Sequence, residues 1–187
     1  MIEVRPGGRR RIDRVLGPGY LSDLGELALS VLRERRDEAA QEETDLSYLR
    51  RLLHARIDIV RAEQERRSSG GESSVVERLA AILADNAIGP ATGSGRHQRL
   101  EPSRAGEHRR FAEALIGDTD LSDVSTLSDE KLVNALNRYA DEEVSVSSYR
   151  REVQGVMDTI NAEIATRYRK GTASVDDLLD TERGGPE

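Results

Sequence analysis

The sequence predicts an all-α protein built on two long helices that pair as a coiled coil, with shorter helices and flexible linkers around them. Hydrophobic residues make up 36% of the 187 residues, charged residues 34% and aromatic residues 3%. This is too little bulky apolar material for a thick two-layer core, and it suits helices packed along a narrow seam. The stretch 27–67 has neither Pro nor Gly. As a helix it would be about 60 Å long, a length that favours a helical partner.

The first half of the chain divides into three expected segments. Residues 1–20 mix glycines with charges and are expected to form a flexible lead-in. Good helix formers dominate 21–67, which is expected to be the first long helix and to stop at the small residues 68–71. A shorter amphipathic helix is expected over 72–88, with apolar residues on one face: Val75, Val76, Leu79, Ile82 and Leu83.

The second half begins with a segment rich in Gly, Pro and Ser, 89–106, which predicts a linker. A short helix is expected over 107–117. The second long helix is expected over 128–170, with Ser128 as its N-cap and Gly171 at its end. A tail, 171–187, closes the chain.

The sequence is internally duplicated. When it is shifted by 100 residues, segments 21–67 and 121–167 align without a gap. The first-segment residues that recur are Leu21, Ser22, Asp23, Leu27, Leu32, Ala40, Glu42, Glu43, Ser47, Arg50, Arg51, Asp58, Ala62, Glu63 and Arg67.

A polar pattern that helix pairing does not require lies inside the duplication. Its residues are spaced by four, three, four and four positions, which keeps them on one stripe of a helix within an arc of roughly 80°. The first copy is Glu43, Ser47, Arg50, His54 and Asp58, and the second is Glu143, Ser147, Arg150, Gln154 and Asp158.

An apolar seam runs beside each stripe. Its residues are Leu46, Leu49, Leu53, Ile57 and Val60 in the first copy, and Val146, Tyr149, Val153, Met157, Ile160 and Ile164 in the second. Pairing the helices through these seams would place both stripes beside one groove.

The residue types of the stripe suit a guanine ligand that carries phosphates. An Arg guanidinium matches guanine O6 and N7 as a two-pronged donor. An Asp carboxylate can accept from guanine N1–H and N2–H, and Arg can balance phosphate charge. The duplication favours a ligand with two-fold symmetry, or two copies of one ligand.

The chain resembles the RsiG family, whose signature E-x3-S-x2-R-x3-Q-x3-D occurs twice, once on each helix of a coiled coil. The second copy matches at all five positions, and the first departs only at His54, where the signature has Gln. The resemblance extends over most of the chain, including the segments LSYLRRLLHARIDIVRAE, EHRRFAEALI and AEIATRYRKG.

The resemblance implies an antiparallel coiled coil in which all ten stripe residues bind cyclic-di-GMP as an intercalated dimer, two molecules per chain. It also implies that the loaded protein sequesters a WhiG-type sigma factor and so blocks transcription of late sporulation genes. An antiparallel arrangement would relate the two motifs by a pseudo-two-fold axis that matches the symmetry of the ligand.

Other functional classes are less well supported. A net charge of −7 disfavours direct nucleic-acid binding, and the absence of Cys fits a cytoplasmic protein without disulfides. There is no long apolar segment for a membrane, and no nucleophile–base pair, phosphate loop or metal cluster for an enzyme. The alternative is a nucleotide-independent coiled-coil adaptor or oligomerisation protein, in which the stripes are solvated faces or salt bridges.

Two repeated or aromatic pairs near the stripe stay open. Arg51 and Arg151 recur in the duplication, each about 100° around the helix from the signature Arg that precedes it, and they could contact phosphate or sigma factor. Tyr48 and Tyr149 are expected to pack rather than to stack on bases.

Overall fold

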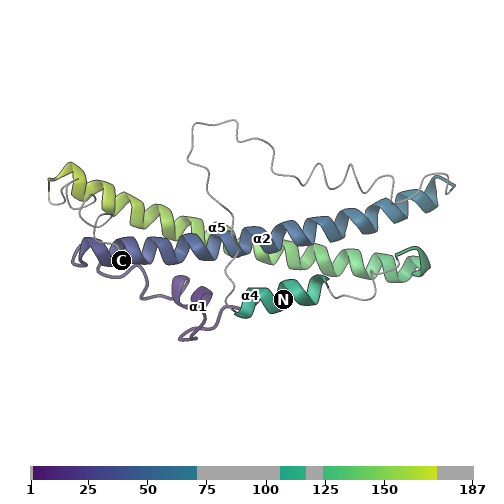
Figure 1. Cartoon of the computed structure of the whole chain (residues 1–187), viewed down its shortest axis with the longest axis horizontal. Helices are drawn as coiled ribbons and strands as arrows, with labels where there is room; N and C mark the ends of the chain where they lie inside the picture. The colour runs from purple at the N-terminus through teal and green to yellow at the C-terminus, as the bar shows by residue number, and fades with distance from the viewer. Residues whose placement is uncertain (1, 71–105, 117–123, 172–187) are drawn as a thin grey trace, which may run out of the picture. The chain divides into compact units, whose positions relative to one another are not determined.

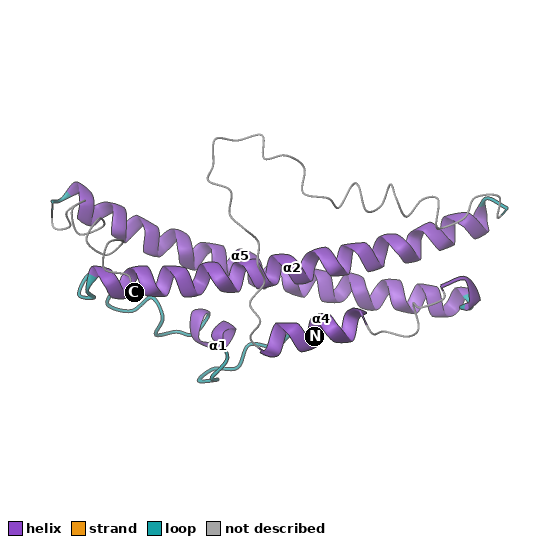
Figure 2. Cartoon of the chain, viewed as in Figure 1, coloured by secondary structure: helices purple, strands orange, loops and turns teal. Residues whose placement is uncertain are grey.

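The computed structural model describes residues 2–70, 106–116 and 124–171, and no strand occurs among them. The predicted all-α class is therefore confirmed (Figure 2). In chain order the elements are α1 (Arg11–Val15), α2 (Leu29–Ser68), α4 (Gly106–Ile116), a 3₁₀ turn η2 (Val124–Thr126) and α5 (Asp129–Arg169).

The chain forms two compact units, and each contains one part of α2 and one part of α5. The first unit comprises residues 1–3 and 44–150. The second comprises residues 4–43 and 151–187.

The first unit has its core between the end of α2 and the beginning of α5. All five seam residues expected on α2 are buried there: Leu46, Leu49, Leu53, Ile57 and Val60. Across from them α5 buries Leu132, Tyr139 and Val146, whereas Tyr149 is only half-buried. Arg67 at the end of α2 is ion-paired with Asp129 at the start of α5, so the two helices are antiparallel here (Figure 1).

The second unit has its core between the beginning of α2 and the end of α5. Leu32 and Ala39 of α2 are wholly buried, together with Val153 and Ile160 of α5. Ile164 is also buried, while Met157 is half-buried. Arg33 near the start of α2 donates to Tyr168 Oη near the end of α5, so the pairing is antiparallel in this unit as well (Figure 1).

An Arg in the last turns of each long helix holds the chain segment that leads into the other helix. In the first unit Arg67 Nη2 donates to the carbonyl oxygens of Val124 and Ser125, at 3.3 and 3.2 Å. In the second unit Arg167 donates to the carbonyl oxygens of Leu24 and Leu27, both at 2.6 Å.

The duplication also repeats a carboxylate that orients each of these arginines. Glu63 accepts from Arg67 at 2.7 Å, and Glu163 accepts from Arg167 at 3.0 Å. Both pairs are four residues apart, the spacing at which side chains of a helix meet. Glu63, Arg67, Glu163 and Arg167 therefore recur because they close the ends of the helix pairs.

The segment expected to form a flexible lead-in, residues 1–20, contains the short helix α1. Ile12 and Val15 of α1 are each only 1% exposed. Asp13 accepts hydrogen bonds from the Arg10 side chain and from the Arg5 backbone N–H. The Arg10 hydrogen bond is the main cause of the lowered pKa of Asp13, and it outweighs the opposing effect of burial. The segment 4–20 is thus packed in the second unit through buried side chains.

The ends of the long helices differ slightly from the expected ones. The first starts at Leu29 rather than at 21, because the residues before it form turns and Asp23 has a left-handed φ of 55°. Ser128 caps α5, since its Oγ accepts from the Lys131 backbone N–H at 3.3 Å. Gly171, with φ 68°, follows the end of α5 in the conformation that glycine favours.

Two predicted segments, the helix at 72–88 and most of the linker at 89–106, lie outside the described residues, as does the tail from 172 onward. The short helix expected over 107–117 corresponds to α4, Gly106–Ile116.

Candidate functional site

The ten stripe residues all lie on the two long helices, and nine of them are half-buried; Asp158 is exposed. Half-burial follows from their position beside the seam, since side chains about a quarter-turn from a buried face lie at its rim. The first unit holds Ser47, Arg50, His54, Asp58, Glu143, Ser147 and Arg150, and the second holds Glu43, Gln154 and Asp158.

Glu143 is the centre of the polar cluster in the first unit. Its Oε1 accepts a hydrogen bond from Arg50 Nε at 2.9 Å and another from Ser147 Oγ at 2.6 Å. His54 Nε2 lies 3.2 Å from the same oxygen. Arg50 Nε also lies 3.0 Å from Ser147 Oγ. The cluster thus joins the third and fourth signature residues of copy one to the first and second of copy two.

The carboxylate of Glu143 is held in its charged form. Partial burial alone would raise its pKa. The hydrogen bonds from Ser147 and Arg50, together with nearby positive charge, lower the pKa by more, so that it lies below the ordinary value. Glu143 therefore presents an acceptor oxygen over the neutral pH range.

The second unit contains the corresponding pair with the two copies exchanged. Gln154 Nε2 donates to Glu43 Oε1 at 3.2 Å. This joins the fourth signature residue of copy two to the first of copy one. The same two signature positions meet in the first unit as His54 and Glu143.

The first and fourth signature positions thus face each other across the helices in both units. This pairing follows from the antiparallel direction of the helices, which brings the start of one motif beside the far part of the other. Each polar cluster is consequently made of residues from both copies. Arg50 is thus ion-paired with a carboxylate of the other helix, that of Glu143.

The side-chain groups of the two clusters can form hydrogen bonds with a base. The first unit gathers a carboxylate, a guanidinium, a hydroxyl and an imidazole, and the second pairs a carboxylate with an amide. These groups can donate to and accept from the edge of a purine base. The imidazole of His54 can donate or accept through Nε2, whereas the amide of Gln154 can do both.

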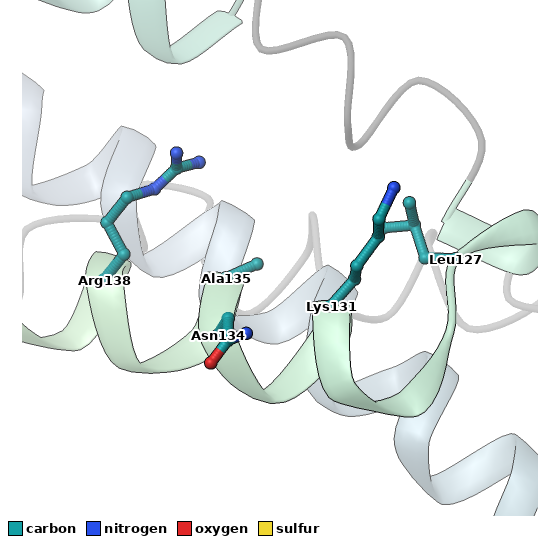
Figure 3. A pocket seen from close by; sticks show the side chains of 5 residues that line it. All are labelled: Leu127, Lys131, Asn134, Ala135 and Arg138. Carbon is teal, nitrogen blue, oxygen red and sulfur yellow. The ribbon is translucent and has the colours of Figure 1, made fainter.

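A pocket of about 200 Å³ in the first unit lies apart from the stripe, and none of the ten predicted residues is among those that line it. Its lining is Leu127, Lys131, Asn134, Ala135 and Arg138 (Figure 3). The side chains of Lys131 and Arg138 point the same way from α5 (Figure 3). The sequence pattern does not indicate this pocket, because none of its lining residues belongs to the polar stripe.

The neighbours of the stripe differ in exposure. Tyr48 is 36% exposed and lies outside the core, while Tyr149 is half-buried. Arg51 and Arg151 are both exposed. Only part of the Tyr48 side chain is therefore packed against the protein.

The fold and the site together define a protein of paired long antiparallel helices that carries a duplicated polar signature at the rim of its seams. The chain belongs to the RsiG-like family: the family model matches residues 18–83 and 118–182, well over half of the sequence. The two matched regions begin 100 residues apart, which is the shift that aligns the duplication.

Membership of this family supports a regulatory role of the anti-sigma-factor type in general terms. A search of curated proteins gave no match. Within the described ranges, no helix combines the length and apolar character needed to cross a membrane.

Proposed function

We propose that this protein is an anti-sigma factor that binds cyclic-di-GMP through its two signature copies and then sequesters a WhiG-type sporulation sigma factor. The observation that carries the proposal is the repeated contact between the first and fourth signature positions, His54 with Glu143 and Gln154 with Glu43. Two clusters built on the same pair of signature positions suit a ligand with two equivalent halves, or two molecules of one ligand.

The donor and acceptor groups fit guanine. A carboxylate such as Glu143 can accept from N1–H and N2–H, and a guanidinium such as Arg50 can donate to O6 and N7. In the free protein these two side chains are bound to each other at 2.9 Å. A guanine would therefore replace an existing pair of polar contacts rather than leave either charge unsatisfied.

Regulation requires that nucleotide and sigma factor favour the same arrangement of the helices. A ligand shifts an equilibrium only by the difference between its affinities for the two states. Ligand contacts from both long helices would favour one register of the helix pair. A sigma factor that binds this register would be captured more tightly when the nucleotide is present.

The test is calorimetric titration of cyclic-di-GMP into the purified full chain. We expect two molecules per chain, and no measurable binding by Asp58→Ala or Arg150→Ala, whose helicity by circular dichroism should equal that of the wild type. Val144→Ala, a change at a side chain that is 66% exposed on α5, is the matched control and should bind normally. Absence of heat from the wild-type protein would contradict the proposal and favour a nucleotide-independent adaptor.

A further inference from the structure

The signature residues do not supply the positive charge that a phosphate-bearing ligand requires; this argument rests on the function proposed above. The ten signature residues include two arginines, Arg50 and Arg150, against four carboxylates, so their summed charge is negative. These carboxylates are Glu43, Asp58, Glu143 and Asp158. Cyclic-di-GMP carries two phosphodiester charges, so further cations beside the clusters would favour its binding.

Arg51 has the position and the free donors for this role in the first unit. It follows Ser47 by four residues and precedes His54 by three, so it neighbours both signature side chains on the helix surface. Its side chain is exposed. Among the residues that the structure describes, it has no hydrogen-bond or ion-pair partner, whereas Arg50 is bound by Glu143 and Ser147.

Arg151 repeats this arrangement in the second unit. It precedes Gln154 by three residues and Asp158 by seven, which places all three on one face of α5. Its side chain is likewise exposed and has no polar partner within the described part of the chain. Each polar cluster thus has one uncommitted guanidinium beside it, at the same step of the duplicated sequence.

We propose that Arg51 and Arg151 are the phosphate-binding residues of the two half-sites and lie just outside the signature. A guanidinium matches two phosphate oxygens with parallel N–H donors, and it keeps its charge at any relevant pH. Its position at the exposed edge lets a phosphate stay partly hydrated while the base is read by the half-buried stripe. Separate binding of the phosphate by this Arg and of the base by the stripe explains why an exposed Arg next to the motif recurs in both copies.

Arg61 provides a control on the same helix: it lies one turn beyond Asp58, the last signature residue of copy one, and so tests whether any exposed Arg beside the stripe would serve. It is exposed, belongs to the first unit and has no polar partner among the described residues, as for Arg51. The position 100 residues later is Asn161, so this arginine is not part of the repeat. A general loss of surface charge would affect Arg61→Gln and Arg51→Gln equally.

The experiment is titration of the full chain with cyclic-di-GMP at low and at physiological salt, comparing wild type with Arg51→Gln, Arg151→Gln, Arg51→Lys and Arg61→Gln. We expect about a tenfold loss of affinity for each Gln variant of the repeated pair at low salt, since a charge-assisted hydrogen bond is lost. Added salt should weaken the wild type more than these variants. Arg51→Lys should lie between them and the wild type, and Arg61→Gln should stay within about twofold of wild type.

The possible failures are distinguishable. If the wild-type chain does not bind the nucleotide, the proposed function fails and this inference fails with it. If it binds and Arg51→Gln and Arg151→Gln match Arg61→Gln, the phosphate assignment alone is wrong. Loss of sigma-factor capture by these variants at unchanged nucleotide affinity would also overturn the assignment, because it would show that the two arginines contact the sigma factor and not the phosphates.

Discussion

Arg50 of α2 and Glu143 of α5 are joined by a 2.9 Å hydrogen bond between Nε and Oε1, although 93 residues separate them in the sequence. Ser147 and His54 converge on the same carboxylate oxygen. The contact links the two copies of a duplicated motif within one compact unit, and the antiparallel direction of the helices produces it. Because this polar contact lies at the rim of the seam and not in the buried core, its loss should affect ligand recognition more than folding.

We expect Glu143→Gln to lower the free energy of unfolding by about 1 kcal/mol, because a partly exposed ion pair contributes little to stability. Nucleotide affinity should fall by at least tenfold, since the carboxylate acceptor for guanine is lost. Urea unfolding and calorimetric titration measure the two effects. Glu34→Gln, an exposed change elsewhere on α2, is the control. Equal nucleotide affinities for the two variants would show that Glu143 does not bind the nucleotide.

A substitution in the apolar seam should, in contrast, mainly affect stability. Leu53 is wholly buried in the first unit, so Leu53→Ala should lower the free energy of unfolding by about 2–5 kcal/mol through lost burial and the cavity left behind. Val144 is 66% exposed on the same unit, and Val144→Ala should change stability by less than about 0.5 kcal/mol. Chemical denaturation followed by circular dichroism compares them. Similar losses for both variants would contradict the assignment of the seam.

Acid should destabilise the first unit through Glu63. The Arg66 hydrogen bond, which outweighs burial, and a second bond from Arg67 lower the pKa of this buried carboxyl from 4.5 to about 2. A lowered folded-state pKa means that the stabilisation is complete above pH 4.5 and is lost as the pH falls towards 2. The full effect amounts to at most about 3 kcal/mol.

Comparison of the wild type with Glu63→Gln isolates this contribution. The wild type should lose more stability than the variant between pH 5 and pH 2, as measured by urea unfolding at each pH. Glu143, whose pKa is also lowered, is retained in both proteins and cancels from the comparison. Parallel pH profiles for the two proteins would show that Glu63 does not contribute in this way.

The seam and the signature could be predicted from sequence because both are periodic. Leu46, Leu49 and Leu53 recur at helical spacing, and all three are wholly buried. The Glu–Ser–Arg–Gln/His–Asp spacing places its residues on one side of each helix, and nine of the ten are half-buried. Periodicity alone did not give the direction of the helices, which came from the resemblance and is now fixed by the contacts of Arg67 and Arg33.

Features held by contacts between distant residues could not be predicted in this way. The helix α1 is only five residues long, and its stability comes from burial of Ile12 and Val15 rather than from a visible repeat. The recurrence of Glu63 and Arg67 was visible in the sequence. Their role was not, since the carbonyl groups that Arg67 binds lie more than fifty residues away.

The most direct test of the central claim is capture of a purified WhiG-type sigma factor by the full chain with and without saturating cyclic-di-GMP, using wild type and Asp58→Ala. We expect capture only by the wild type and only with the nucleotide, while Asp58→Ala remains folded and captures none. Equal capture by Asp58→Ala, or capture by the wild type without nucleotide, would contradict it.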